Sequence, residues 1–278
     1  MKIEVIYEDE DILVINKPAG TTVNSADTTR NEETVQDWSE EKIKVQISKI
    51  IDNKESDYYN NDLIKVAQVK RGTTDPVEKS VNYISNPTRD FVNRGGIVHR
   101  LDKETSGVLV LAKNPESFIE LQRQFKERIV EKVYIALAHG KLVPDRGVIS
   151  EPVGRLPWNR MQFGVVPGGR ESVTNYKVTS YYRGKNGQQY SYVELNPKTG
   201  RTHQIRVHLK YIGYPIFADF LYAGRKTARN DRKLLNRVFL HAAQIKFVHP
   251  KTGQELFFAS KLPEELAQVI SSLEKIEE

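Results

Sequence analysis

The sequence predicts an α+β fold with a mostly antiparallel sheet, flanked by helices and loops. Many short runs with strand character are spread along the 278 residues, few segments have helical periodicity, and a turn-rich hairpin signal lies near the C-terminus. A chain of this length can bury a sizeable core. We therefore expect one domain over residues 1–278, interrupted by a variable and flexible insertion at 52–93, where the sequence is polar and weakly periodic.

The first part of the chain predicts two short strands and one helix. Residues 3–7 and 11–16 have strand character on either side of an acidic turn. Pro18 and Gly20 end the second strand, because proline has no ladder donor and glycine permits a turn. Isoleucines at spacings of three and four predict a helix over 34–51.

Apolar runs and capping residues predict the later elements. Val108–Leu111 is a continuous apolar run, typical of a buried strand. Asn114 followed by Pro115 is typical of a helix start. Thr202 is a candidate cap for a helix that Gly213 would end. The remaining expected elements are strands over 133–138, 172–182 and 189–196, a hairpin over 239–259 and a helix over 263–273.

Composition excludes several classes of chemistry. The chain has no cysteine, which rules out disulfides, thiolate catalysis and Cys-ligated zinc. No apolar run approaches the ~18 residues of a membrane helix, and the N-terminus lacks a signal-peptide core. We therefore expect a cytoplasmic protein. No phosphate-binding loop, dinucleotide fingerprint or serine elbow occurs, so nucleotide hydrolysis, dinucleotide redox chemistry and serine acyl transfer lack support.

The charges are distributed unevenly. The formal net charge is +6, but residues 201–251 hold 11 Lys/Arg against 2 Asp/Glu, whereas residues 31–62 hold 4 against 9. A local +9 beside a local −5 favours one surface for a polyanion. A solvated basic loop is the alternative, and charge alone does not separate the two.

A charged cluster at His99–Glu104 lies between two apolar runs and is followed by the turn Thr105–Gly107. Such a loop would present Asp102 at the rim of a sheet, where rigid scaffolds place reactive groups. The alternative is structural: Asp102 could cap the turn or pair with Arg100.

A second polar cluster, Gly200–His208, opens a helix whose later turns are apolar. Helix N-termini favour anions, so a carboxylate or phosphate could lie there. His203 and His208 are five apart and would point roughly 140° from each other on a helix of ~3.6 residues per turn. A shared metal is therefore not expected, and we interpret both as hydrogen-bonding residues.

The string His-Arg-Leu-Asp-Lys-Glu-Thr-Ser-Gly at 99–107 closely resembles the signature of the RluA family of pseudouridine synthases. The resemblance covers roughly residues 3–24 and 95–262, in family order. It implies the pseudouridine synthase catalytic fold with a central active-site cleft. The other matching segments are Asn16–Gly20, Glu131–Ala136, Gly200–His208, Phe239–Ala242 and His249–Pro250.

The resemblance implies a cofactor-free and metal-free isomerisation of uridine to pseudouridine in ribosomal or transfer RNA. Asp102 would be the nucleophile or the base at the sugar, and Arg201 its paired cation. Tyr134 would stack on the uracil and assist proton transfer, and Arg100 would fill the space left by the flipped base. Further substrate contacts implied by the family are Thr105, His203 and Ile205.

Other expectations concern partners and departures from the family pattern. The matching pattern starts at Ile3, so we expect no S4-like RNA-binding domain, no membrane or DNA partner and a monomer. The basic run Arg225–Arg237 is a candidate for RNA backbone contact. Residues 218–223 depart from the family's Gly-Asp-Pro-Leu-Tyr-Gly, at positions that we expect to lie outside catalysis. The alternatives are a catalytically inactive RNA-binding protein on the same fold and a hydrolase releasing uracil.

Overall fold

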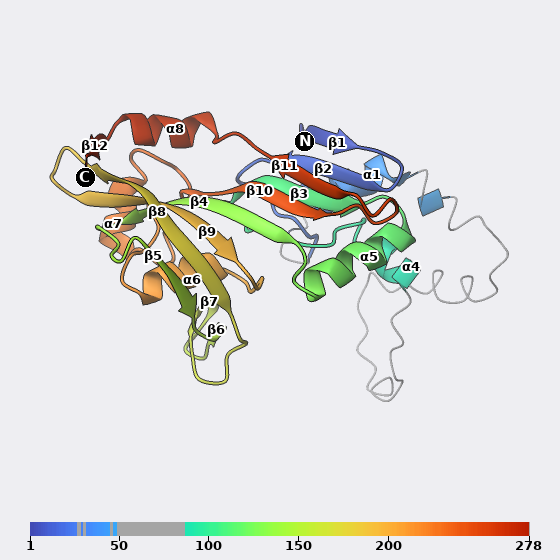
Figure 1. Ribbon diagram of the computed structural model, residues 1–278, viewed down its shortest axis with the longest axis horizontal. Coiled ribbons are helices and arrows are strands. Elements are labelled where there is room, and N and C mark those ends of the chain that lie inside the picture. The colour runs from blue at the N-terminus through green and yellow to red at the C-terminus, as the bar shows by residue number, and fades with distance from the viewer. Residues whose placement is uncertain (27–28, 30–31, 45–46, 49–86, 278) are drawn as a thin grey trace.

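A computed structural model describes residues 1–26, 29, 32–44, 47–48 and 87–277. Its dominant feature is a ten-stranded sheet that extends along the long axis of the molecule, from β8 and β12 at one end to β1 at the other (Figure 1). The described elements are β1 (Glu4–Glu8), β2 (Ile12–Lys17), α1 (Val35–Lys42), α4 (Pro87–Asn93), β3 (Ser106–Ala112), α5 (Pro115–Lys126), β4 (Glu131–His139), β5 (Arg146–Ser150), β6 (Val153–Leu156), β7 (Asn159–Val165), β8 (Val173–Arg183), β9 (Gln189–Pro197), α6 (Gln204–Tyr211), α7 (Arg225–Asp231), β10 (Leu240–Val248), β11 (Glu255–Ala259), α8 (Glu264–Ser271) and β12 (Glu274–Ile276).

The sheet has the order β1-β2-β3-β10-β4-β9-β8-β12, with β11 paired to β10 and β5 to β8. Among these described strands, β3 and β10 form the one parallel pair, which confirms the predicted mostly antiparallel sheet. Gly107 explains how closely this pair meets: a Cβ on it would lie 2.1 Å from the carbonyl oxygen of Ala242, and its φ is +118°. Only glycine permits this approach at the base of the 99–105 loop.

Three apolar clusters hold the sheet to its helices. One packs Phe118 and Leu121 of α5 with Phe91 of α4 against β2, β3 and β10. Another packs Leu209 of α6 and Leu266 of α8 around β4 and β9. In the sheet, β4 lies between β10 and β9 (Figure 1), so a residue on β4 is held by a strand on each side.

Several expected elements are confirmed, and their caps explain them. Asn114 accepts a hydrogen bond from the N–H of Ser117 and starts α5. The predicted hairpin corresponds to β10 and β11, and the closing helix to α8. Gly213, with φ +90°, follows the end of α6 as predicted. No helix among the described residues is both long and apolar enough to cross a membrane.

Other expectations are corrected. The helix expected over 34–51 begins as α1, Val35–Lys42, with Thr34 and Asp37 forming a capping box at its start. The chain turns at residue 43, residues 44 and 47–48 are helical again, and 45–46 and 49–51 lie outside the described residues. Most of the insertion expected at 52–93 lies outside the described residues, but its end, 87–93, is helix α4. Thr202 does not cap α6; the N-cap is His203, in a left-handed conformation with φ 56°. Sequence patterns did not indicate β5, β6, β7, α7 or β12.

Candidate active site

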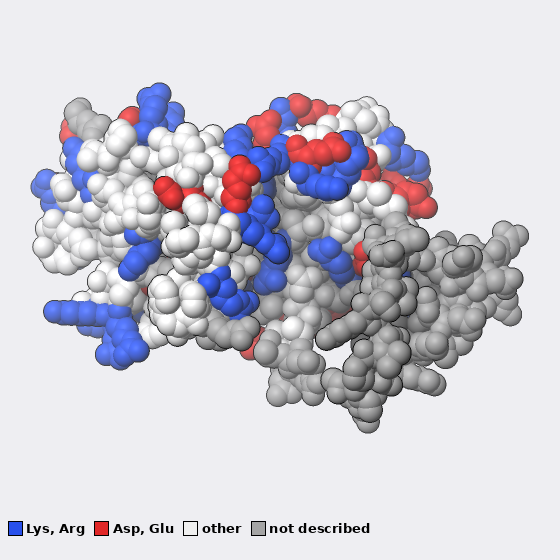
Figure 2. Space-filling view, turned by 90° about the horizontal axis from the view of Figure 1, so that it is seen from below, with Lys and Arg blue, Asp and Glu red and all other residues white. Residues whose placement is uncertain are grey.

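A cleft of about 400 Å³ opens beside β4, and every site residue named from the sequence lines it. Its walls come from residues 94–105, the end of α5, β4 and the segment 197–206. Lys and Arg side chains gather along the hollow across this face of the molecule (Figure 2). The sequence-predicted residues in the lining are Arg100, Asp102, Thr105, Tyr134, Arg201, His203 and Ile205.

The loop with Asp102 is held from below by the Lys17 ammonium. This ammonium is fully buried and donates to the carbonyl oxygens of Pro18 (2.8 Å), Thr21 (2.8 Å) and Lys103 (3.2 Å). Burial lowers the pKa of Lys17 to about 7, and the nearby charge of Asp102 opposes this change. The Asn-Lys-Pro segment therefore fixes the backbone next to Asp102.

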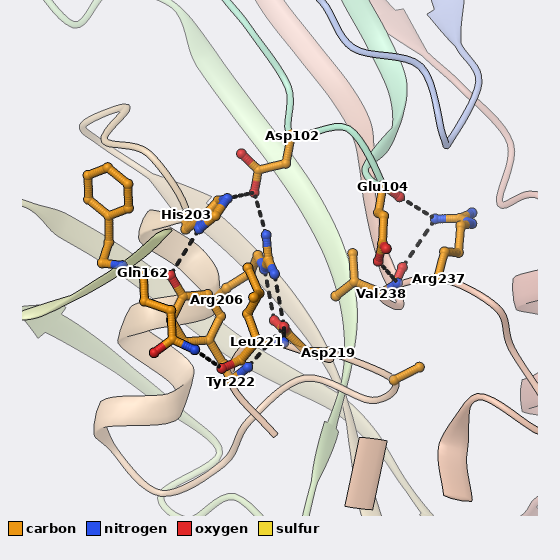
Figure 3. A network of polar contacts seen from close by, with 12 residues as sticks. Asp102, Glu104, Gln162, His203, Arg206, Asp219, Leu221, Tyr222, Arg237 and Val238 are labelled. Carbon is orange, nitrogen blue, oxygen red and sulfur yellow. Dashed lines mark hydrogen bonds and ion pairs between the residues drawn. The ribbon is translucent and has the colours of Figure 1, made fainter. Parts of the chain in front are cut away.

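Asp102 forms its ion pair with Arg206, not with the expected Arg201. Nη1 of Arg206 lies 3.3 Å from Oδ2 of Asp102, and its Nε and Nη2 donate to the two oxygens of Asp219 at 2.8 and 2.9 Å (Figure 3). Asp219 is fully buried and the Arg206 side chain is 8% exposed. Arg206 is thus a planar clamp between two carboxylates.

The expectation for Arg201 is wrong because the chain turns between the two arginines. His203 adopts the left-handed conformation, and α6 begins only at Gln204. Arg206 therefore lies in the first turn of α6 and faces Asp102. Arg201 precedes the turn, still lines the cleft, and donates from Nε to the carbonyl oxygen of Glu171 at 3.3 Å.

His203 connects Asp102 to strand β7. Its Nε2 lies 3.9 Å from Oδ2 of Asp102, and its Nδ1 is 2.9 Å from the hydroxyl of Tyr222. That hydroxyl accepts a hydrogen bond from the N–H of Phe163 at 3.1 Å, which favours donation of the hydroxyl's own proton to Nδ1 (Figure 3). The proton of the neutral ring then lies on Nε2, toward Asp102. Burial lowers the pKa of His203, with Asp102 opposing, so the ring is neutral near pH 7.

Tyr134 lies on β4 and faces the same cleft. Burial, and then the charge of Asp102, raise the pKa of Tyr134 well above its usual value. The phenol is therefore neutral near pH 7, and it can stack or exchange a hydrogen bond but is not a standing base.

The side chain of Glu104 belongs to a structural network that holds the start of β3 and does not line the cleft. It binds Arg232 through Nη2 at 2.9 and 2.7 Å and accepts the N–H of Val238 at 2.9 Å. Arg237 donates to the Glu104 carbonyl (Figure 3) and also to the carboxylate of Glu265. These bonds correct one expectation for the basic run Arg225–Arg237: the last of these arginines is 7% exposed and already bound. Those left exposed are Arg225, Lys226, Arg229 and Lys233.

Three other predicted contacts differ in their availability to a ligand. Arg100 is exposed at the mouth of the cleft. Thr105 is 2% exposed, and among the described residues its Oγ1 is the buried side-chain polar atom that has no hydrogen-bond partner. Ile205 is 6% exposed and offers an apolar wall. The second predicted hydrogen-bonding histidine, His208, is buried between Thr174 and the carbonyl of Glu151.

One group of described residues has the donor set of a metal site, away from the cleft. The ligand atoms of Asp9, Asp11 and His249 lie within 4.8 Å of one another. Oδ1 of Asp9 already accepts the N–H groups of Asp11 and Ile12, and Oδ2 is bound by Tyr7 and His249. This group joins the β1–β2 turn to the β10–β11 hairpin, and its bonds explain it without a cation.

Sequence reasoning missed Asp219, Tyr222 and the role of Arg206. Asp219 and Tyr222 fall in the 218–223 segment, which we expected to include no catalytic position, yet they fix Arg206 and His203. The available signal was that this segment, although it departs from the family's Gly-Asp-Pro-Leu-Tyr-Gly at other positions, keeps the aspartate and the tyrosine. That segment therefore belongs to the candidate active site.

Comparisons with known proteins agree with this geometry. Residues 11–211 match the family model described as RNA pseudouridylate synthase. An RNA pseudouridine synthase of Bacillus subtilis is 34% identical over 275 residues, which are 99% of this chain and 74% of that protein. Ribosomal large subunit pseudouridine synthase D of Neisseria meningitidis serogroup B is 33% identical, over 98% of this chain and 62% of that protein. A chloroplastic RNA pseudouridine synthase 2 of Oryza sativa is 34% identical, and the chain spans 65% of its length.

Solved structures confirm the expected fold. Human RNA pseudouridylate synthase domain containing 1 has a TM-score of 0.65 at 24% identity, over 99% of this chain and 89% of that one. Human RNA pseudouridylate synthase domain containing 4 has a TM-score of 0.59 at 22% identity, over 98% and 94%. Both show the same mixed architecture around a central sheet.

Proposed function

The chain belongs to the RNA pseudouridylate synthase family, and we propose that its cleft converts uridine to pseudouridine in ribosomal RNA, with Asp102 as the essential carboxylate. One observation carries the proposal: Asp102 is paired to a clamped arginine in a cleft whose described lining has seven Lys/Arg and no second acid. The name of the Neisseria relative supports ribosomal RNA as the substrate. The cytoplasm, where bacteria assemble ribosomes, is the proposed compartment.

The reaction is an isomerisation in which every atom is retained. The C1′–N1 bond breaks, the uracil turns, and a C1′–C5 bond forms; C5 loses its proton and N1 gains one. Asp102 would act at the ribose, either by attack on the sugar or as a base. Because substrate and product are isomers, the residues need only bind, orient and move protons.

The Arg206 clamp explains how Asp102 can be oriented and still react. Arg206 holds one positive charge between two carboxylates, so the three groups together keep a charge of −1. The short bidentate bonds go to Asp219, and the bond to Asp102 is longer. Asp102 is therefore positioned without full neutralisation, as a nucleophile or base requires.

The neighbouring residues form a niche for a flipped uracil. Tyr134 offers an aromatic face to the uracil, and its neutral hydroxyl can relay the proton that leaves C5, accepting that proton as it gives up its own. Thr105 offers its unpartnered Oγ1 to a polar atom of the substrate, and Ile205 an apolar contact. Arg100, exposed at the mouth, can stack in the gap left by the flipped base and bind phosphate.

The test is to incubate the protein with total RNA from a strain that lacks its gene, and to map pseudouridine by chemical sequencing. We expect a new site in ribosomal RNA with the wild type and none with Asp102→Asn, while Asp102→Asn still folds and binds RNA. Equal product from both would refute the role of Asp102. Binding without product in the wild type would favour the inactive RNA-binding alternative, and free uracil in the supernatant the hydrolase.

A further inference from the structure

A lysine on the strand that carries Tyr134 points into the same cleft. Lys132 and Tyr134 are two apart on β4, so their side chains share one face of the sheet, about 6.6 Å apart along the strand. Both line the cleft, and so does Lys198, which directly follows β9. β9 is hydrogen-bonded to β4 from Tyr134 onward, which places these two lysines near each other.

Lys132 is a half-buried cation without an anionic partner. Among the described residues, no carboxylate lies within salt-bridge distance of its ammonium, and the contact recorded for Nζ is the Phe125 ring at 5.9 Å. Burial, and then the positive charge of Lys198, together lower the pKa of Lys132 to about 8. Two like charges beside one cleft destabilise each other until an anion binds between them.

We propose that Lys132 and Lys198 together bind one phosphate of the RNA backbone beside the flipped nucleotide. This inference rests on the proposed function, because RNA is the polyanion that brings a phosphate to the cleft while its uracil lies against Tyr134. The ammonium groups suit this task, since lysine binds phosphate as a compact point charge. Arg100 comes from a different segment of the lining, the 99–105 loop, and is assigned to the gap left by the flipped base.

The structure supplies a matched control. Lys246 lies on β10, next to β4, but its ammonium is already 2.9 Å from the carboxylate of Glu255 and is absent from the described lining of the cleft. Lys132→Met and Lys246→Met therefore remove the same charge from neighbouring strands. Only the first removes a cation that is free to bind RNA.

The experiment measures RNA binding as a function of salt in an Asp102→Asn background, which prevents turnover. The probes are ribosomal RNA stem-loops with the target uridine, either unmodified or with one neutral methylphosphonate linkage placed on its 5′ or its 3′ side. The slope of log K against log salt is negative, and we expect Lys132→Met to reduce its magnitude by about 0.7–0.9, the value for one lost phosphate contact. Lys198→Met should lower it too, and Lys246→Met should leave it unchanged.

At one of the two positions, the methylphosphonate should reduce the magnitude of the salt slope of the Asp102→Asn parent by the same amount. In the protein that also carries Lys132→Met, the same linkage should have no further effect on the slope. An unchanged slope in Lys132→Met, or equal effects of both linkages in both proteins, would overturn the proposal and leave Lys132 as a cation packed on Phe125. Thermal melting checks that each variant is folded. Pseudouridine formation by the Asp102-containing protein is measured separately, so failure of the isomerase assignment would be distinguished from failure of the phosphate site.

Discussion

Two sets of cations lie in the cleft or behind the loop that carries Asp102, and they differ in whether a carboxylate already binds them. Arg206 lies 2.8 Å from the carboxylate of Asp219, and Arg232 and Arg237 have equally close acidic partners. Lys132 and Lys198, by contrast, face the cleft with no carboxylate at salt-bridge distance among the described residues.

This difference separates two tasks. The bound arginines fix the loop that carries Asp102 and the strand that follows it, so their loss should change folding and catalysis. The unpaired lysines are available to the substrate, so their loss should change RNA binding and its salt dependence. A substitution that affects both properties equally would break the comparison.

The largest effect is expected from Arg206→Lys. Lysine keeps the charge but cannot make the fork of bonds that reaches Asp219 and Asp102 together. We expect the single-turnover rate of pseudouridine formation to fall by about 10²- to 10³-fold, as for the loss of one preorganised catalytic donor. The salt slope of RNA binding should stay at the wild-type value, because the charge remains. A rate within a few-fold of wild type would show that the clamp is dispensable.

Asp219→Asn should mainly lower stability. Asparagine keeps one acceptor oxygen but removes the negative charge and one of the two short bonds to the buried guanidinium of Arg206, and breaking a buried ion pair costs roughly 3 kcal/mol or more. Urea denaturation measures this free energy of unfolding. Glu10→Gln is the control: that side chain is 93% exposed and 3.9 Å from Lys251, so its effect should stay within about 0.5 kcal/mol. Equal effects of the two substitutions would contradict the structural role of the clamp.

Tyr222→Phe tests the hydrogen bond to His203, and we expect a smaller effect than from either change at the clamp. It removes the hydroxyl between the N–H of Phe163 and Nδ1 of His203, and leaves both without that partner. We expect a loss of about 1 kcal/mol in the free energy of unfolding. The reaction rate should fall several-fold with unchanged RNA affinity, because the ring that faces Asp102 loses its orientation. A rate loss as large as that of Arg206→Lys would mean that the orientation of His203 matters as much as the arginine clamp.

Local sequence patterns predicted those features that depend on local physics. The cap at Asn114, the glycine after α6 and the β10–β11 hairpin follow from backbone preferences within a few residues. The resemblance at residues 99–107 placed Asp102 in the cleft because a contiguous loop stays together in any fold. The family and the fold are both confirmed by the comparisons.

The features that were missed depend on distant partners. Choosing between Arg201 and Arg206 required the left-handed turn at His203 and the bonds to Asp219, 13 residues further along the chain. Similarly, only the fold shows that Glu104 meets Arg232, 128 residues away, and is therefore not an acid of the cleft. Motif spacing does not predict such long-range contacts, so it indicated the right segment but the wrong arginine.

The smallest expected effect concerns Ala218, which stands where the family usually has glycine. Its φ of 60° places an alanine in the left-handed region, at a cost of roughly 1–2 kcal/mol, while replacing alanine by glycine costs about 0.4–1 kcal/mol through the unfolded chain. Ala218→Gly should therefore be neutral to mildly stabilising. Ala223→Gly, the second departure, relieves no positive φ and should be less stable than Ala218→Gly by about 1 kcal/mol. Urea denaturation of the two variants compares their free energies of unfolding. If Ala218→Gly were the less stable of the two, packing of the buried Ala218 methyl would outweigh its backbone strain.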